Sequence, residues 1–267
     1  MTRRVSIVGF GNIGAQLAAI IRQSALADIS AILVKPDALP RLTGQFGDLP
    51  FVVSLDHLLN SRPNTVIECA NALVLSEIAH PVLRAGCMLV AASTSALASE
   101  SLYVGMQAAV RKYGAKFLIP AGAIGATDSL AAMRLSGLDR VVYRGIKPPA
   151  AWRGTEAEEL CSLHSIRQST TFFTGSARQA AISFPRNANV AATVGIAGAG
   201  LDETIVELVA EPGADQNRHE IEAFGSAGKI SFQATWHPSP NNLKTSSIIP
   251  YSLLAAAFRG EGAIPIV

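Results

Sequence analysis

Three glycines near the start of the sequence have the spacing of a phosphate-binding turn. Gly9, Gly11 and Gly14 form a Gly-x-Gly-x-x-Gly run between the β-branched stretch 5–8 and an amphipathic stretch over residues 15–22. In such a run the first glycine allows a tight turn, the second lets backbone approach a pyrophosphate, and the third lets helix and strand pack closely. The run predicts a dinucleotide site, although a tight turn without a ligand has the same spacing.

The residues around this run bear on the choice of cofactor. We expect the first helical residues, Asn12 and Ile13, to offer backbone N–H groups to phosphate. An acidic residue at the end of the second strand usually binds the adenosine ribose. Here Lys35 stands in that place, and Asp37 is displaced behind Pro36. A cation can meet a 2′-phosphate, so both NADP and NAD are expected cofactors; a lysine that faces solvent is the alternative.

A group that could move a proton is the second chemical feature, and histidine titrates nearest to neutral pH. The sequence has five histidines, which are His57, His80, His164, His219 and His237. His219 begins a predicted strand in the back half, from which a side chain can face a nicotinamide ring. It is the candidate base, and a solvated histidine at a strand end is the alternative.

Apolar strands alternate with helical segments in the front half, which is typical of a doubly wound parallel α/β sheet of the Rossmann kind. The predicted strands are 5–8, 28–34, 65–70, 87–93 and 115–123, and the predicted helices are 15–22, 55–60, 74–85 and 99–113. Ligands bind beyond the carboxyl ends of such strands. We therefore expect Ala70, Asn71, the run from Ser93 through Thr94 to Ser95, and residues 121–124 to lie around the cofactor.

The back half has the pattern of a second, α+β domain for substrate and dimerisation. The segment 140–152 predicts a strand followed by a proline-broken loop, and 170–185 predicts a strand, a turn and a helix. Three consecutive strands are predicted over 203–212, 218–228 and 229–239, and a small-residue helix follows Asn187 or Asn189 as its N-cap. A last helix over 246–258 is expected to return to the front domain. The predicted dinucleotide-binding domain is 1–120 with 240–267, and the second domain is 121–239.

Composition excludes several other classes of protein. The chain has 267 residues, 49% of them hydrophobic and 16% charged, with a net charge of +2. This balance permits a large core and gives no basic patch for nucleic acid. No apolar run reaches the length of a membrane span, and no signal peptide is expected. Three cysteines without Cys-x-x-Cys spacing predict neither disulfides nor a metal site, which is typical of a cytosolic protein.

Motifs along almost the whole chain resemble those of the L-aspartate dehydrogenases in order and spacing. They are GFGNIG, PAGAIGATDSL, KPPAAWRGT, GSARQAA, FPRNANVAAT, NRHEIE and PSPNNLKTSS. The resemblance implies oxidation of L-aspartate with NAD or NADP to iminoaspartate, which hydrolyses to oxaloacetate and ammonia or feeds nicotinamide-cofactor synthesis. It also implies a cytosolic homodimer, cofactor contacts by Ala123 and Asn189, and catalysis by His219.

A substrate with two carboxylates needs cations and hydroxyl groups. Lys244 is the predicted carboxylate partner, with Thr245 and Ser246 beside it; capping of the last helix is the alternative role for the two hydroxyls. Ser93 and Thr94 are expected to contact substrate near the nicotinamide. The chain departs from the family pattern there, at Thr94-Ser95, and also at Asn71-Ala72.

Other functions fit the same scaffold, since fold does not fix function. One is another NAD(P)-linked oxidoreductase, similar to dihydrodipicolinate reductase or homoserine dehydrogenase. Another is a protein that senses dinucleotides without turnover. Cys69 at a strand end is a conceivable nucleophile, as in semialdehyde dehydrogenases, but a buried, inert cysteine fits its apolar surroundings better.

Overall fold

The computed structural model describes residues 3–24, 27–239 and 242–258, which fold into two compact units. Of these residues, the first unit takes in 3–24, 27–93, 99–120 and 250–258, and the second takes in 94–98, 121–239 and 242–249. Within the described residues, no helix is both long and apolar enough to cross a membrane.

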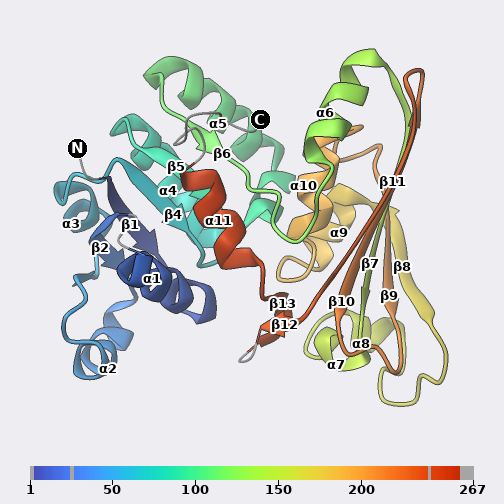
Figure 1. Cartoon of the computed structure of the whole chain (residues 1–267), viewed down its shortest axis with the longest axis horizontal. Coiled ribbons are helices and arrows are strands. Elements are labelled where there is room, and N and C mark those ends of the chain that lie inside the picture. The colour runs from blue at the N-terminus through green and yellow to red at the C-terminus, as the bar shows by residue number, and fades with distance from the viewer. Residues whose placement is uncertain (1–2, 25–26, 240–241, 259–267) are drawn as a thin grey trace. The chain divides into compact units, whose positions relative to one another are not determined.

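The first unit is built on a six-stranded parallel sheet with the order β3-β2-β1-β4-β5-β6 (Figure 1). Its strands are β1 (Arg4–Val8), β2 (Asp28–Leu33), β3 (Phe51–Val52), β4 (Thr65–Glu68), β5 (Met88–Ala91) and β6 (Phe117–Leu118). β1 and β4 are buried almost throughout, as expected for strands covered on both faces. The strand order reverses between β1 and β4, and a crevice for ligands forms at that point in such sheets. The predicted doubly wound fold is confirmed.

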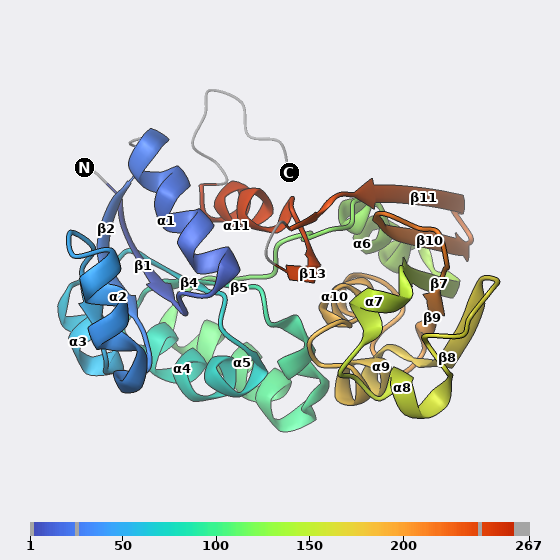
Figure 2. The ribbon, with the colours of Figure 1, turned by 90° about the horizontal axis from the view of Figure 1, so that it is seen from below.

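Helices cover both faces of this sheet, with α1 and α11 on one face and α4 and α5 on the other (Figure 2). The unit contains α1 (Asn12–Ser24), a 3-10 turn η1 (Pro36–Ala38), α2 (Leu39–Gln45), α3 (Leu55–Asn60), α4 (Ala72–Arg84), α5 (Glu100–Tyr113) and α11 (Ile249–Ala257). Ser54, Asn71 and Ser99 cap α3, α4 and α5, each accepting a hydrogen bond from the backbone N–H three residues on. The caps fix where each helix begins after its strand.

The second unit is built on a five-stranded mixed sheet with the order β11-β10-β7-β9-β8. Its strands are β7 (Leu138–Lys147), β8 (Thr170–Ser176), β9 (Ile205–Ala210), β10 (Asn217–Gly225) and β11 (Gly228–Trp236), and β12 (Pro238–Ser239) pairs separately with β13 (Asn242–Ser246). The helical segments are η2 (Thr94–Ala98), α6 (Thr127–Ser136), α7 (Pro149–Trp152), α8 (Ala157–Leu160), α9 (Ala177–Ser183) and α10 (Asn189–Ala197). Within this unit α6, α9 and α10 lie on one face of the sheet (Figure 1). The other face carries the ion pairs of Arg144 with Glu207 and of Arg218 with Glu220.

Several predicted details are wrong. Ser246 is the last residue of β13, and the final helix begins at Ile249, because the preceding stretch pairs as a hairpin. Neither Asn187 nor Asn189 caps α10: Ala188 holds the N-cap position without a side-chain hydrogen bond, and Asn189 is the first helical residue. The elements α2, β3 and α6 are not predicted by the sequence pattern.

Candidate active site

The glycine loop between β1 and α1 leaves no room for a side chain at two positions. Gly9 has a φ of +95°, and a Cβ there would lie 2.9 Å from the Cβ of Ala70. A Cβ on Gly14 would collide with the carbonyl oxygen of Gly9. At Gly11, by contrast, a Cβ would meet no described atom within 4 Å. The loop is therefore packed tightly at its base and open at Gly11, which suits the close approach of a pyrophosphate.

The start of α1 presents backbone N–H groups beside this loop. The helix begins at Asn12, and Ala15 donates its backbone N–H to the carbonyl oxygen of Gly11 at 3.0 Å. The N–H groups of Asn12 and Ile13 precede that bond, at the positive end of the helix dipole. The Asn12 side chain accepts a hydrogen bond from Gln16 at 3.1 Å, which holds it along the helix.

A cavity of about 460 Å³ lies at the carboxyl ends of β1, β2 and β4. Gly9, Lys35, Ala70 and Asn71, all predicted to contact the cofactor, line it together with mainly apolar side chains. Its volume is within the range of sites that bind small molecules. The residues present thus fit a dinucleotide: a glycine cradle and helix N-terminus for phosphate, and an apolar cavity beside them.

Two cationic side chains line this cavity, and one of them, Arg41, is not predicted from the sequence. Lys35 follows β2 and is exposed, as is Arg41 on α2. Asp37 is not among the lining residues. Arg41 could not be assigned from the sequence because α2 was not predicted. Two positive side chains beyond β2 fit a 2′-phosphate better than a carboxylate would.

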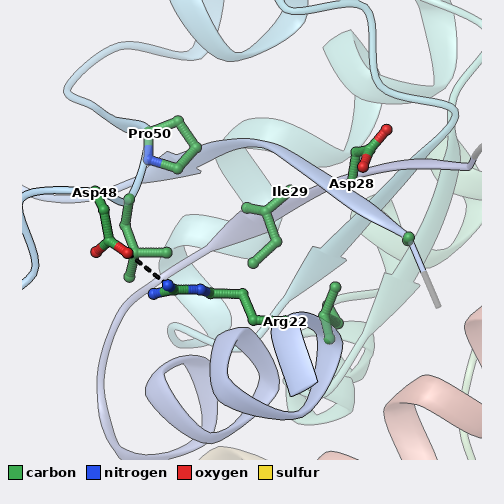
Figure 3. Close-up of a pocket in the computed structure, with 8 residues that line it drawn as sticks. Arg22, Asp28, Ile29, Asp48 and Pro50 are labelled. Carbon is green, nitrogen blue, oxygen red and sulfur yellow. Dashed lines mark ion pairs between the residues drawn. The ribbon is translucent and has the colours of Figure 1, made fainter. Parts of the chain in front are cut away.

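A second cavity, of about 390 Å³, lies at the opposite end of β2 (Figure 3). Asp28 at the start of that strand and Ile29 line it, with Arg22 from the end of α1. The Arg22 guanidinium is already paired with Asp48 at 2.5 Å. This cavity is at the amino ends of the strands, where ligands of such sheets do not bind.

A buried carboxyl group ties together the ends of β4 and β5. Glu68 accepts hydrogen bonds from the backbone N–H of Ala70 at 2.7 Å, the backbone N–H of Ser93 at 3.1 Å and the Ser93 hydroxyl at 2.8 Å. Burial raises the pKa of Glu68, and these hydrogen bonds oppose the rise. The hydroxyl of Ser93, predicted to contact substrate, therefore donates its hydrogen bond to Glu68.

Asn71, two residues after Cys69, caps α4 with its side chain.

Thr94 and Asn189 lie together in the second unit. The Thr94 hydroxyl donates to the backbone oxygen of Asn189 at 2.7 Å, and the Ser95 N–H donates to the Asn189 side-chain oxygen at 2.9 Å. The segment Thr94–Ala98 is thereby attached to the start of α10. A residue expected to contact cofactor and one expected to contact substrate thus share one network.

Ala123 is buried in the loop that precedes α6. Its carbonyl oxygen accepts a hydrogen bond from the Trp236 indole at 2.7 Å. Its role as a cofactor contact stays a prediction.

His219 is buried, with 1% of its surface exposed, and is not a solvated strand end. Its Nδ1 lies 2.7 Å from the Tyr143 hydroxyl. Among the described residues, its Nε2 has no hydrogen-bond partner. A buried polar nitrogen without a partner is costly unless it serves a ligand. Nε2 is therefore the atom at which His219 could exchange a proton.

The register of the sheet explains how Tyr143 reaches His219. His219 on β10 pairs with Gly145 on β7, so Tyr143 and Gly145 lie on the same face of the sheet as the imidazole. A Cβ on residue 145 would lie only 2.9 Å from the Tyr143 hydroxyl oxygen. The glycine leaves the space through which the phenol approaches the ring.

The electrostatic surroundings of His219 differ from the expectation of a base matched to neutral pH. Burial, and then the charge of Lys147, lower its pKa from 6.5 to about 3. The imidazole is thus neutral at physiological pH and able to accept a proton. Burial raises the pKa of Tyr143, so the phenol stays protonated beside it.

Lys147 is a site residue that the sequence pattern does not single out. It has 4% of its surface exposed, and its ammonium donates to the backbone oxygen of Lys244 at 3.1 Å. A lysine in "YRGIK" suggests a surface position by residue type. In a strand, however, every second side chain points to the same face, so Lys147 lies on the buried face with Tyr143 and Gly145. This alternation is the feature of the sequence from which its burial could have been predicted.

Lys244, Thr245 and Ser246 all lie on β13 rather than at a helix start. Ser246 is buried, and its hydroxyl oxygen lies 3.4 Å from the Asn217 amide nitrogen on β10. Since Lys147 bonds to the backbone of Lys244, β13 lies beside the ends of β7 and β10. The predicted carboxylate partner is therefore in the same part of the unit as His219.

Cys69 is buried, and burial raises the pKa of its thiol well above the ordinary value. Its thiol lies 3.4 Å from the backbone oxygen of Val8. A thiol held protonated is a poor nucleophile.

Across the described part of the chain, no three His, Cys, Asp or Glu side chains are grouped to hold a metal ion.

Both halves of the sequence match known families. Residues 9–120 match the NAD binding domain of homoserine dehydrogenase, and residues 128–260 match the C-terminal domain of aspartate dehydrogenase. The first unit is accordingly a domain that binds NAD or NADP.

Similarity to individual proteins extends over the whole chain. The L-aspartate dehydrogenase of Cupriavidus taiwanensis is 37% identical over 98% of this chain and 99% of its own. That of Acinetobacter baumannii is 34% identical over 99% of this chain and 100% of its own. The crystal structure of Thermotoga maritima aspartate dehydrogenase superposes over 100% of both chains with a TM-score of 0.77 and 25% identity. A hyperthermophilic archaeal homoserine dehydrogenase in complex with NADPH shares the fold, with a TM-score of 0.60, 13% identity and coverage of 97% of this chain and 98% of its own.

This identity extends over both units, the glycine loop follows β1 as predicted, and His219 lies on β10. The chain therefore belongs to the L-aspartate dehydrogenase family, oxidoreductases that act on a CH–NH2 group.

Proposed function

We propose that this protein oxidises L-aspartate with NAD or NADP to iminoaspartate, which hydrolyses to oxaloacetate and ammonia. The observation that carries the proposal is the buried His219, held at Nδ1 by Tyr143, in the unit that matches aspartate dehydrogenases. The proposal includes a cytosolic location and a homodimer, both carried over from the family resemblance.

The proposed cofactor contacts come from the glycine loop and its neighbours and, by the family resemblance, from Ala123 and Asn189. When bound, the nicotinamide ring accepts a hydride from the substrate. The residues proposed to hold the cofactor are Gly9, Gly11, Asn12, Ile13, Gly14, Lys35, Ala70, Asn71, Ala123 and Asn189. The glycine loop and the start of α1 would bind the phosphates, and Lys35 would bind the ribose end.

His219 is proposed to take the amine proton. The ammonium group of L-aspartate must lose a proton before its nitrogen can form a double bond to Cα. His219 accepts that proton at Nε2, which requires that Nδ1 carries a hydrogen and donates it to the Tyr143 oxygen. The Cα–H bond then breaks with its electron pair leaving as hydride, and the nitrogen lone pair forms the C=N bond.

The same residue serves the second half of the reaction. Water adds to the C=N carbon and loses one proton to solvent, which leaves a hydroxyl and a neutral amine on that carbon. The protonated His219 returns the proton it took to the nitrogen, which leaves as ammonia while the hydroxyl loses its proton to solvent and forms C=O, so the imidazole ends neutral. Tyr143 accepts from Nδ1 throughout, which keeps the ring oriented.

The negative charge of the substrate raises the pKa of His219, which is low in the ligand-free protein. In the ligand-free protein, burial and Lys147 lower its pKa to about 3. The two carboxylates of aspartate bring negative charge that offsets Lys147. An opposite charge within a few ångströms favours the protonated imidazole, so substrate binding raises this pKa toward neutrality.

Initial rates test the proposal. We would measure reduction of NAD and of NADP with L-aspartate, D-aspartate, L-glutamate and L-homoserine. L-Aspartate is expected to be the best substrate by kcat/KM. A preference for L-homoserine would identify another oxidoreductase on the same scaffold. Tight NADH binding with no turnover of any of the four would identify a dinucleotide sensor.

A further inference from the structure

We infer that Lys147 is a substrate-binding residue, whose buried ammonium binds one carboxylate of a dicarboxylate beside His219. The inference rests on the proposed function, and it gives Lys147 a role in substrate binding in addition to its electrostatic effect on His219.

The sheet register brings Lys147 close to the base. His219 pairs directly with Gly145, and Lys147 lies two residues further along β7 on the same face. Diagonal neighbours of this kind in an antiparallel pair have Cα atoms about 7–8 Å apart, within reach of a long side chain. Lys147 also lowers the pKa of His219 by its charge, which agrees with this proximity.

Lys147 is a buried cation without an anion. Its ammonium has one neutral acceptor, the backbone oxygen of Lys244, and lies 5.4 Å from the centre of the Trp152 ring. No carboxylate of the described chain lies within ion-pair distance of it. Lysine is rarely buried unless it is paired, because the charge loses its hydration. Burial, and then the charge of Lys244, lower its pKa from 10.5 to about 8.

A second cation completes the arrangement. Lys244 is connected to Lys147 through its backbone, and a Cβ on Gly154 would lie 3.8 Å from the Lys244 ammonium. Lys147 is the last residue of β7 and Lys244 lies in the middle of β13, so both lysines lie close to the face that carries His219. Two ammonium groups that repel one another are the complement of a ligand with two carboxylates. A four-carbon amino dicarboxylate satisfies both and leaves its amine for His219.

The glycine opposite His219 is consistent with this assignment. Gly145 separates Tyr143 from Lys147 on one strand, so the phenol can reach the ring at Nδ1. A larger residue would displace Tyr143. Tyr143 and Lys147 thus act on the imidazole from two sides, one by a hydrogen bond and the other by charge.

The test compares Lys147→Met and Lys147→Arg with a matched control. Lys229→Met makes the same change at an exposed lysine on β11 of the same sheet. For each protein we would measure kcat and KM for L-aspartate, NADH affinity by fluorescence, and binding of succinate to the NADH complex by calorimetry. Circular dichroism and thermal unfolding report whether each variant folds.

Lys147→Met is expected to raise the KM for L-aspartate and to weaken succinate about 10- to 100-fold, the loss typical of a hydrogen bond to a charged group. NADH affinity is expected to stay unchanged, and Lys147→Arg to recover part of the succinate affinity. Lys229→Met is expected to match the wild type. Wild-type KM and succinate affinity in Lys147→Met would overturn the inference, as would a loss of kcat alone, which would mark Lys147 as a proton-transfer group. If Lys147→Met does not fold, Lys147→Arg is the test, because arginine differs from lysine in reach. A changed succinate affinity with unchanged NADH affinity in Lys147→Arg supports the binding role, and wild-type succinate affinity overturns it.

Succinate binding separates this inference from the proposed function. If the wild type binds succinate through Lys147 but does not oxidise L-aspartate, the proposed function fails and the inference about dicarboxylate binding stands. If the wild type oxidises L-aspartate and Lys147→Met behaves like the wild type, the inference about Lys147 fails and the proposed function stands.

Discussion

The Tyr143 hydroxyl lies 2.7 Å from Nδ1 of His219, and both side chains are buried on one face of the second sheet. This contact decides which ring nitrogen can exchange a proton with a ligand. Because Nδ1 is occupied by Tyr143, the exchange falls to Nε2.

Removal of the hydroxyl tests this relationship. Tyr143→Phe is expected to lower kcat about tenfold or more, since a buried hydrogen bond that orients the ring is lost. NADH affinity is expected to be unchanged, and the acidic limb of the kcat–pH profile is expected to move. Tyr251→Phe, at an exposed tyrosine on α11, is the control. A Tyr143→Phe enzyme with wild-type kcat and pH profile would show that the contact serves packing only.

Removal of the imidazole tests the base itself. His219→Ala and His219→Gln are expected to lower kcat for L-aspartate by about a hundred- to ten-thousand-fold, the contribution of a positioned general base. Both are expected to keep NADH affinity and to lose the acidic limb of the kcat–pH profile. His57→Gln, at an exposed histidine on α3, is the control. Substantial turnover with an unchanged pH profile in either variant would assign the base to another group.

The lowered pKa of His219 predicts a pH-dependent stability. Between pH 6.5 and about 3 the unfolded chain binds a proton at this residue that the folded protein does not. The free energy of unfolding therefore falls as the pH is lowered through this window, by up to about 1.4 kcal/mol for each pH unit. Urea unfolding at several pH values measures the slope. His219→Gln is expected to make it shallower than in the wild type and in His57→Gln; equal slopes in all three would contradict a buried neutral histidine.

The open space at Gly11 predicts a variant that folds but does not bind nucleotide. Gly11→Val places its Cβ where no described atom lies within 4 Å, so folding is expected to be retained. The side chain would occupy the space needed for the pyrophosphate, and NADH binding is expected to be lost. Fluorescence titration measures it, with Gly105→Val on α5 as the control, since a Cβ there also meets open space. Unchanged NADH affinity would mean that the loop is only a turn.

The cations beyond β2 predict the discrimination between cofactors. Lys35→Asp is expected to weaken NADPH by about 1–3 kcal/mol and NADH much less, because a like charge replaces the partner of the 2′-phosphate. Arg41→Asp is expected to act in the same direction. Lys116→Asp, at an exposed lysine before β6, is the control. Equal effects on both cofactors would show that these cations face solvent.

Much of the first unit could be predicted because its signals are local. Strand residues are apolar and β-branched, the glycine run fixes the first turn, and Ser54, Asn71 and Ser99 mark helix starts. The short elements α2 and β3 were missed, since two or seven residues carry little periodicity. Arg41 was missed with them.

The second unit was harder because its order depends on distant pairing. β7 lies between β9 and β10, although β9 and β10 are consecutive in the chain. Only that pairing brings Tyr143 and Lys147 beside His219, and no local pattern reveals it. Asn189 was expected to cap a helix by residue type, but its side-chain oxygen accepts from Ser95 instead.

The path of the chain between its two units restricts how relatives can be recombined. The chain leaves the first unit after Ser93, returns after Ala98, leaves again after Pro120 and comes back at Pro250. A chimera with a single crossover near residue 120 would combine one parent's β1 with the other parent's α11. Arg3 donates a hydrogen bond to the carbonyl oxygen of Ala257 on α11, so that junction would mix two parents inside one core. Exchange of the second unit by gene fusion therefore requires an internal cassette from residue 121 to 249, together with the short graft 94–98.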